Sequence, residues 1–280
     1  HFEFVLDEGS SFADGAQFGL PGRLCACIGV YEKGYCDVRV TLHDKGGHSS
    51  TPALPTALGR MTKLIEEVEK RPFPVRPTHI FYEMYKAAAP YGGLWSRVKA
   101  ANPRLFGQGF LNQQLQSLQG NASVRTTVAA TQIHASDTPN VLPQTVWANF
   151  NCRLNPGDTR QELVEFFQEL AGPDCEVTLP ISFEASKIAS TTSPAYRTIS
   201  QSVRQVYGEI PVVPSVFFAS TDSQYFNELA DDVYKYMPFI SNLKYTTTMH
   251  TTNERIDVDS FAEGVQFYAQ LLRNVCTHNA

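Results

Sequence analysis

Apolar residues occur in this sequence in two patterns, and each pattern is typical of one kind of β-sheet. Strands that are buried on both faces, as in a parallel sheet, read as continuous apolar runs. Such runs lie at residues 2–6, 24–30 and 212–218. Strands with one buried face alternate apolar with polar residues. This alternation occurs at residues 36–43, 146–154 and 175–183. We therefore expect an α/β part and an antiparallel part.

The alternating strands and the helices between them predict one inserted domain over residues 33–186. Apolar residues at helical spacing follow the strand at 36–43, and a second helix opens with the capping box Thr159-x-x-Glu162. The resulting order, βαββαβ, is that of a ferredoxin-like α+β sandwich. Residues 72–121 are rich in proline and aromatic residues, and they read as a helical excursion from this domain.

The flanking segments predict a second domain, of the α/β class with a mainly parallel sheet. Residues 1–32 and 187–280 carry the continuous apolar runs, and residues 261–275 add a helix with an apolar stripe. We expect the chain to leave this domain at a polar hinge near residues 31–34. The predicted fold class is α/β with an inserted α+β domain.

One histidine is distinguished by its position in the chain. Residues 45–52 read KGGHSSTP, so His48 follows a strand and a Gly-Gly turn and precedes a helix start. This arrangement leaves the imidazole open to approach. A histidine is more often a surface or capping residue, however, and a Gly-Gly pair after a strand is usually only a turn. The local pattern leaves a functional and a structural role open for His48.

Six short motifs, taken in order along the chain, resemble one family of enzymes. They are DEG from Asp7, GGHSSTP around His48, NVLP from Asn140, CRLNPG around Arg153, STDS from Ser220 and HTTNE from His250. Together they resemble the carboxypeptidase S and aminoacylase family of two-zinc amidohydrolases. The nearest branch is carboxypeptidase S with the N-acyl amino acid hydrolases. The resemblance extends over essentially the whole chain and corresponds to the C-terminal portion of the family's members.

The resemblance implies part of a zinc-peptidase catalytic domain whose complete active site holds two Zn²⁺ ions. It implies that Asp7 is a carboxylate ligand of one zinc ion and that His250 is an imidazole ligand of the other. Asp7 also follows an apolar strand, at the kind of sheet edge where ligands bind in α/β proteins. Without the resemblance, Asp7 would be read as a solvated turn and His250 as a loop histidine, with Glu254 as a second candidate ligand.

The resemblance also implies residues that bind the substrate. His48 resembles the residue that donates a hydrogen bond to the scissile carbonyl oxygen as it becomes an oxyanion. Arg153 and Asn140 resemble the pair that binds the free α-carboxylate of the substrate, for which a guanidinium is well shaped. Ser220 and Thr221 resemble the start of a turn at the substrate pocket. The strand pattern alone would equally make Arg153 a solvated charge.

The resemblance implies that the family's remaining zinc ligands lie upstream of the Asp-Glu-Gly motif. They are a histidine close to an aspartate, the bridging aspartate, and a Glu-Glu pair that supplies a ligand and the general base. Because the sequence opens inside an apolar strand that leads directly to Asp7, it reads as a fragment. We therefore expect the 280-residue chain by itself to be inactive or nearly so.

The leading hypothesis is zinc-dependent hydrolysis of an amide bond that releases an amino acid with a free α-carboxylate. The substrate would be a small dipeptide or an N-acyl amino acid, and the inserted domain would act as a lid or as the contact of a homodimer. A second hypothesis is a non-catalytic dimerisation or carboxylate-binding module, or one half of a split enzyme. A serine or cysteine hydrolase is disfavoured, because the chain has no GxSxG motif and no cysteine in a recognisable catalytic signature.

Bulk composition limits the classes of binding partner and the cellular locations that we expect for this protein. The net charge of −5 argues against nucleic-acid and anionic-membrane partners. No apolar run reaches the length of about 18 residues that a membrane span requires. The six cysteines form no CxxC pair, which disfavours a thiolate zinc site and a disulfide scaffold. We expect a soluble protein, with a cytoplasmic location slightly favoured and a secreted, vacuolar or lysosomal one left open.

Overall fold

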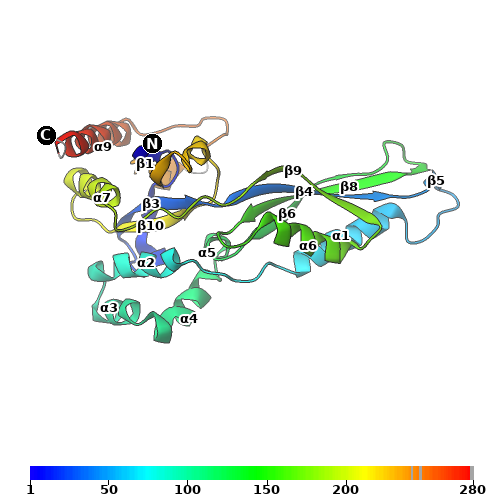
Figure 1. Cartoon of the computed structure of the whole chain (residues 1–280), viewed down its shortest axis with the longest axis horizontal. Coiled ribbons are helices and arrows are strands. Elements are labelled where there is room, and N and C mark those ends of the chain that lie inside the picture. Colours follow the sequence, from blue (N-terminus) through cyan, green and yellow to red (C-terminus); the bar gives the residue numbers. More distant parts are fainter. Residues whose placement is uncertain (241, 246–247, 278–280) are drawn as a thin grey trace. The chain divides into compact units, whose positions relative to one another are not determined.

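The computed structural model describes residues 1–240, 242–245 and 248–277, and the chain divides into two compact units (Figure 1). Unit 1 comprises residues 1–32, 77–123 and 186–280. Unit 2 comprises residues 33–76 and 124–185. Each unit has its own hydrophobic core, as the two patterns of apolar residues predict.

Unit 1 is built around a mixed sheet. Its strands, in spatial order, are β1 (Phe2–Asp7), β11 (Ala230–Lys235), β3 (Leu24–Glu32) and β10 (Val212–Phe217), with β2 (Phe12–Asp14) paired to β3. β1 is parallel to β11 and β10 is parallel to β3, but β11 and β3 are antiparallel. The predicted α/β class is confirmed, although the sheet is mixed where a mainly parallel one was expected.

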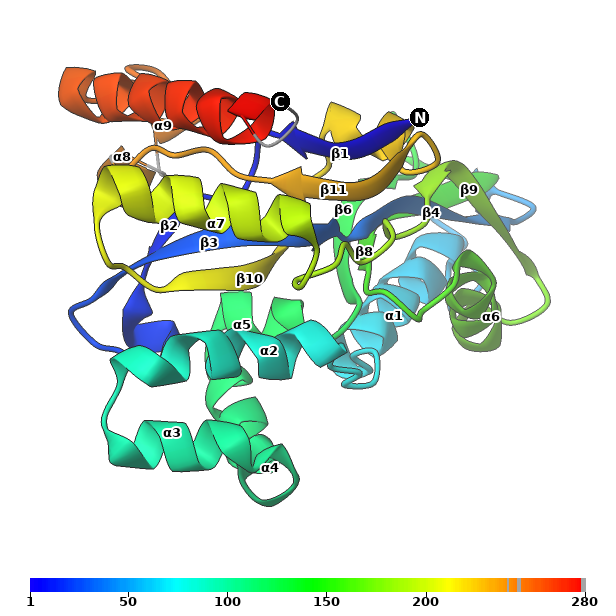
Figure 2. The same cartoon turned by 60° about the vertical axis from the view of Figure 1, so that its left-hand side comes forward.

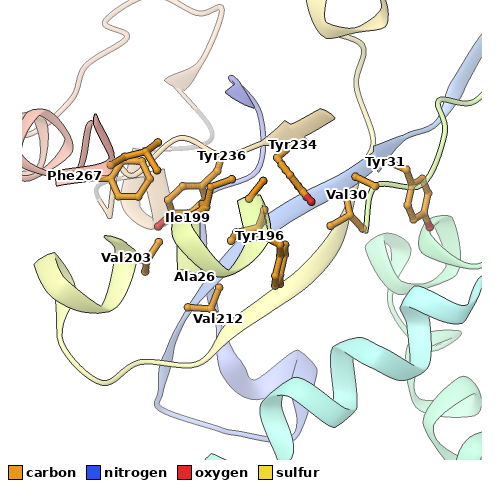
Figure 3. Close-up of a cluster of buried hydrophobic side chains, with 14 of the residues drawn as sticks. Ala26, Val30, Tyr31, Tyr196, Ile199, Val203, Val212, Tyr234, Tyr236 and Phe267 are labelled. Carbon is orange, nitrogen blue, oxygen red and sulfur yellow. The ribbon is translucent and has the colours of Figure 1, made fainter. Parts of the chain in front are cut away.

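Strand β3 is buried on both faces, which explains its continuous apolar run. On one face, Ala26, Ile28 and Val30 belong to the main core of unit 1. Helix α7 (Pro194–Tyr207) runs along this sheet in Figure 2, and it packs against α9 (Val258–Thr277). Figure 3 shows side chains of both helices meeting those of the strands. On the other face, Cys25 and Cys27 belong to a smaller buried cluster.

Helix α9 has two apolar faces, and the sequence pattern marks the exposed one. Phe267 and Leu271 are buried in the core. Phe261, Val265 and Leu272, from the predicted stripe, are 53%, 54% and 64% exposed. Apolar spacing therefore located this helix correctly but did not identify the face that the core takes.

The helical segment 77–123 packs with unit 1, which corrects its predicted assignment to the inserted domain. It contains α2 (His79–Ala88), η2 (Ala89–Tyr91), α3 (Leu94–Ala101), α4 (Pro103–Gln114) and α5 (Leu118–Ser123). Ile80 enters the main core of unit 1, and the buried amide of Gln114 donates to the carbonyl of Gln17 at 3.0 Å and to the Tyr85 hydroxyl at 2.8 Å.

The described residues of unit 1 also form three shorter helices. They are η1 (Gly15–Phe18), η3 (Asp222–Phe226) and α8 (Asn242–Tyr245). In the part of the chain that the structure describes, every helix falls short of the length and apolarity that crossing a membrane requires.

Unit 2 is a ferredoxin-like sandwich, which confirms the predicted βαββαβ order. Its elements are β4 (Gly34–His43), α1 (Ala57–Lys70), β6 (Thr127–His134), β8 (Thr145–Leu154), α6 (Arg160–Ala171) and β9 (Cys175–Phe183). The strands form an antiparallel sheet in the order β6-β8-β4-β9. Helices α1 and α6 lie side by side and share one core with the sheet (Figure 1). The predicted capping box of Thr159 and Glu162 opens α6.

Candidate functional site

Asp7 ends strand β1 and keeps one carboxylate oxygen without a partner. Its Oδ1 accepts a hydrogen bond from the backbone N–H of Glu8 at 2.8 Å. Its Oδ2 is buried and has no hydrogen-bond partner among the described residues. Buried carboxylate oxygens are normally satisfied, and leaving one unpaired is unfavourable. This oxygen is therefore suited to bind a cation.

A buried lysine lies beside Asp7 in the sheet. Lys235 is the register partner of Asp7 in the parallel β1–β11 pair and is fully buried. Burial lowers the pKa of Lys235, and the carboxylates of Glu32 and Asp7 act in the opposite direction. Sequence reasoning missed this residue, because a lysine in a strand is normally exposed.

Thr221 is held by a buried glutamate. Its hydroxyl and its backbone N–H both donate to Oε1 of Glu32, at 2.5 and 3.1 Å. Thr221 also caps η3 by accepting a hydrogen bond from the backbone N–H of Ser223. The neighbouring Ser220 is exposed. Of the two residues predicted to bind substrate here, Ser220 has the freer side chain, and Thr221 anchors the turn.

His250 lies in an exposed turn with an unusual backbone. Its φ of 60° is in the left-handed region, which few residues other than glycine adopt. The carboxylate of Glu254, the second candidate ligand, accepts a hydrogen bond from the backbone N–H of His250 at 3.2 Å. Within the described ranges, no group of three or more His, Cys, Asp or Glu side chains could hold a metal ion. Asp7 fits a ligand by its free oxygen and His250 by its exposed imidazole, but a complete centre needs further donors.

The Gly-Gly turn before His48 requires glycine at both positions. Gly46 and Gly47 have φ values of 67° and 143°, which strain any residue with a side chain. The turn delivers His48 into the two-residue strand β5 (Gly47–His48), which pairs with β7 (Val141–Leu142). The imidazole is exposed beyond the end of β4.

The hydrogen bonds of His48 define which ring nitrogen can donate. Its Nδ1 accepts the backbone N–H of Ser50 at 3.1 Å and lies 2.8 Å from the Ser50 hydroxyl. In the neutral ring, a nitrogen that accepts an N–H carries no proton, so the proton is on Nε2. His48 is exposed and therefore has an Nε2–H that can donate, as an oxyanion donor must.

The structure brings Asn140 close to His48. The backbone N–H of Ser49 donates to the carbonyl of Asn140 at 3.1 Å, and Val141, the next residue, pairs with His48. These residues are distant in sequence and meet at the two-stranded sheet β5-β7, which follows β4 in the chain. Both side chains are exposed there.

Arg153 lies in the four-stranded sheet of unit 2, at the end of β8 that is far from His43. Thr145 of β8 pairs with His43, near His48, whereas Arg153 pairs with Tyr35. At about 3.3 Å per residue, Thr145 and Arg153 are roughly 26 Å apart along the strand. The Arg153 guanidinium stacks over the Tyr35 ring, 4.6 Å from its centroid. Its Nε donates to the side-chain oxygen of the neighbouring Asn151 at 3.2 Å.

A polar network extends from Arg153 across this face of the sheet. Asp37 accepts hydrogen bonds from the amides of Asn149 and Asn151, at 3.3 and 3.0 Å, and from the Tyr35 hydroxyl at 3.0 Å. The network holds the ring and the amide that contact Arg153. It therefore preorganises the guanidinium, which favours the binding of a planar anion.

A cavity of about 600 Å³ in unit 1 adjoins three of the predicted segments. Gly9, two residues after Asp7, lines it, as do Met249, next to His250, and Phe218, two residues before Ser220. The helical segment 77–123 contributes Met84, Gln114, Gln119, Gly120 and Ser123. Mainly apolar cavities of about 300–1,000 Å³ with a few polar groups are typical small-molecule sites.

Comparison with known proteins assigns most of unit 2 to one domain family. Residues 30–178 match the family model of the peptidase dimerisation domain, M20_dimer. A probable carboxypeptidase S-like 2 from Dictyostelium discoideum is 26% identical over an alignment of 279 positions, which covers 98% of this chain and 53% of that protein. The N-fatty-acyl-amino acid synthase/hydrolase PM20D1 from Xenopus tropicalis is 30% identical over an alignment of 284 positions, which covers 99% of this chain and 54% of that protein.

The chain spans about half the length of these curated relatives. Among solved structures, the M20 family metallo-carboxypeptidase Sso-CP2 from Sulfolobus solfataricus superposes with a TM-score of 0.61 at 18% identity. The superposition covers 96% of this chain and 63% of that one. At this identity the likeness shows a shared fold.

Proposed function

Because the chain belongs to the M20 peptidase dimerisation domain family, we propose that it forms part of a metal-dependent hydrolase that releases an amino acid with a free α-carboxylate. Small dipeptides and N-acyl amino acids are the proposed substrates. The activity is proposed for the native polypeptide that carries these residues. The observation that carries the proposal is the buried, unpaired Oδ2 of Asp7, two residues from a cavity of about 600 Å³.

Asp7 and His250 are the proposed ligands of this chain to two Zn²⁺ ions. Bound zinc would polarise the scissile carbonyl and lower the pKa of a water molecule. The free oxygen of Asp7 and the exposed ring of His250 support this role. The described residues hold no group of three donors, so further ligands and a general base would have to come from other residues.

His48 is the proposed donor to the developing oxyanion. The carbonyl oxygen gains negative charge as the tetrahedral intermediate forms, and a fixed N–H donor stabilises that charge more than it stabilises the ground state. The contact of Nδ1 with Ser50 leaves Nε2–H as the donor, and it also limits rotation of the ring. No proton transfer by His48 is needed for this role.

Arg153 is the proposed clamp for the α-carboxylate of the substrate. Stacking on Tyr35 orients the guanidinium plane, and a carboxylate can accept two parallel N–H bonds from such a plane. A substrate whose carboxylate is amidated would lose this charged pair. The clamp therefore predicts selection for free acids.

The distance between Arg153 and His48 supports a homodimer with shared sites. Thr145, which pairs with His43 five residues before His48, lies roughly 26 Å from Arg153 along β8, whereas an extended dipeptide spans only about 7 Å. One unit 2 cannot place both residues on the same small substrate. We therefore propose that one copy supplies Arg153 and that its partner supplies His48 and Asn140.

The cavity that Gly9 lines, two residues after Asp7, is the proposed site for the acyl or N-terminal side of the substrate. Phe12, Phe217 and Met237 give it apolar walls, and the segment 77–123 closes part of it. Because Ser220 lies close in sequence to the lining residue Phe218, it is proposed to contact the same substrate. Thr221 would act through the turn that it holds with Glu32.

The test measures amino acid release from N-acyl amino acids and Gly-X dipeptides by the native polypeptide, with and without a zinc chelator. Zinc-dependent release is expected, together with a strong preference for free-acid substrates over C-terminal amides. Arg153→Ala should abolish that preference, and His48→Ala should lower kcat by about a hundredfold or more. The matched control is Arg71→Ala, which removes an exposed ion pair with Glu169. Full activity in the presence of chelator would overturn the proposal.

Mixing the two variants tests the shared site. If the sites are shared, His48→Ala and Arg153→Ala copies exchanged into one dimer rebuild one complete site. Activity should then rise above that of either variant alone. No recovery, with exchange verified by mass, would refute the two-copy arrangement.

A second candidate function is a non-catalytic dimerisation or carboxylate-binding module. It is favoured by the lack of a group of three metal-binding side chains in the part of the chain that the structure describes. This candidate predicts that the native polypeptide binds free-acid substrates through Arg153 but releases no amino acid at any zinc concentration. The hydrolysis assay distinguishes the two functions directly.

A further inference from the structure

A second cavity in unit 1 shares no lining residue with the one beside Asp7. Its volume is about 710 Å³, and it lies between helices α2 and α7. From α7, Tyr196, Ser200 and Arg204 line it at intervals of four residues, so they form one stripe along the helix. Val212 and Pro214 of β10 complete the wall. This cavity has no part in the proposed amide hydrolysis.

Two hydroxyl groups in this cavity are buried without a partner. Tyr196 and Ser200 are only 8% and 5% exposed, and neither hydroxyl has a hydrogen-bond partner among the described residues. Burial raises the pKa of the Tyr196 phenol, so the group stays protonated and can donate. Nearly all buried hydroxyls in folded proteins are satisfied. Two buried hydroxyls on one face of α7, with no partner among the described residues, therefore indicate a ligand or ordered water between α2 and α7.

The charged residues around the cavity select an anion. Lys86, Arg197 and Arg204 line it, and Glu83 is the only carboxylate among its lining residues. Glu83 is already engaged, because its Oε2 accepts the Thr191 hydroxyl at 2.5 Å. Three cations against one occupied carboxylate leave a positive potential in the cavity.

We propose that this cavity binds a small organic oxyanion, a carboxylate or a phosphate ester. The anionic head accepts hydrogen bonds from the hydroxyls of Tyr196 and Ser200 and pairs with Arg204. The apolar body of the ligand lies against the side chains that complete the lining, which include Ala87, Tyr91 and Val212. This combination of a positive end and apolar walls is typical of sites for small organic acids.

Isothermal titration calorimetry of the 280-residue chain tests the site, with phenyl phosphate and benzoate as probes and benzyl alcohol as the neutral analogue. Saturable binding of at least one anion is expected, and none of the alcohol. Tighter binding of phenyl phosphate assigns the site to phosphate esters, and tighter binding of benzoate assigns it to carboxylates. Tyr196→Phe and Ser200→Ala should each weaken binding about tenfold, since each removes one hydrogen bond to a charged group.

The variants distinguish a specific binding site from non-specific electrostatic attraction. Arg204→Gln should weaken binding more than tenfold, whereas the matched control Arg104→Gln, an exposed arginine of α4 outside the cavity, should leave it unchanged. Tyr196→Phe and Ser200→Ala each delete one hydroxyl oxygen that has no hydrogen-bond partner in the described part of the chain, so both variants should fold normally. The proposal is overturned if neither anion binds, if both hydroxyl variants bind like the parent, or if Arg104→Gln loses as much affinity as Arg204→Gln.

Discussion

Replacing Asp158 with asparagine is predicted to destabilise unit 2 by about 1.5–4 kcal/mol. The side chain of Asp158 is fully buried. It accepts the Thr126 hydroxyl at 2.5 Å and pairs with the guanidinium of Arg76. Arg76 and Thr126 lie where the chain leaves unit 2 and returns to it. The carboxylate of Asp158, in the turn at residues 155–158, therefore holds both of these points.

The magnitude follows from the exposure of each partner. A hydrogen bond to a charged group contributes roughly 1.5–3 kcal/mol, and the buried Thr126 contact counts in full. Arg76 is 45% exposed, so solvent screening reduces its contribution to at most about 1 kcal/mol. Asparagine keeps the shape of the side chain and one acceptor. The loss is therefore that of the charge and not of the packing.

Urea unfolding followed by the fluorescence of Trp147 measures this effect, because Trp147 lies in β8 of unit 2. The second tryptophan, Trp95, is 71% exposed in α3. All variants for this assay are therefore made in a Trp95→Phe background, so that Trp147 is the only fluorescent tryptophan. Asp174→Asn is the matched control, since Asp174 is 78% exposed and 3.8 Å from Arg60. It should change stability by less than about 0.5 kcal/mol. An equally small effect of Asp158→Asn would refute the reasoning.

Three further predictions follow from single buried groups. Burial lowers the pKa of Lys33 to about 7 in the folded protein, from 10.5 for an exposed lysine. Between these two pH values the unfolded chain binds more protons than the folded one, so the free energy of unfolding should rise with pH. Lys33→Met should flatten that rise in urea titrations at several pH values. Asp7→Asn in the native polypeptide should lower the zinc content measured by elemental analysis, and unchanged zinc would exclude Asp7 as a ligand. Gln114→Leu should speed amide hydrogen exchange in α2 and α4, because it removes two hydrogen bonds that hold the segment 77–123; unchanged exchange would contradict this.

Secondary structure in unit 2 was predictable because its signals are local. The alternation in β4 and β9 follows from one buried sheet face, and the capping box of Thr159 and Glu162 acts over three residues. The βαββαβ order then leaves few topologies, of which the antiparallel sandwich is observed. The Gly-Gly pair before His48 is another local signal, because both glycines adopt positive φ values that disfavour residues with a side chain.

In unit 1, local signals were insufficient. Continuous apolar runs report burial on both faces of β3, but they do not report the direction of its neighbours, and the sheet is mixed. Helix α9 has apolar residues on two faces, and only packing against Tyr236 shows that Phe267 lies inside. The segment 77–123 has helical patterns that fit either unit, and contacts such as that of Gln114 with Gln17 assign it to unit 1.

The sequence by itself supplied the candidate site residues, because Asp7, His48 and Arg153 each lie in a short motif that resembles one enzyme family. Only the tertiary structure decided how these residues are grouped. Pairing of β5 with β7 brings Asn140 to His48, while the length of β8 keeps Arg153 at the far end of the sheet. The tertiary structure also revealed the buried Lys235, and two hydroxyls between α2 and α7 that have no partner among the described residues. The reason is physical: strand and helix patterns depend on neighbours in sequence, whereas burial, pairing and unsatisfied polar atoms depend on residues that are distant in sequence.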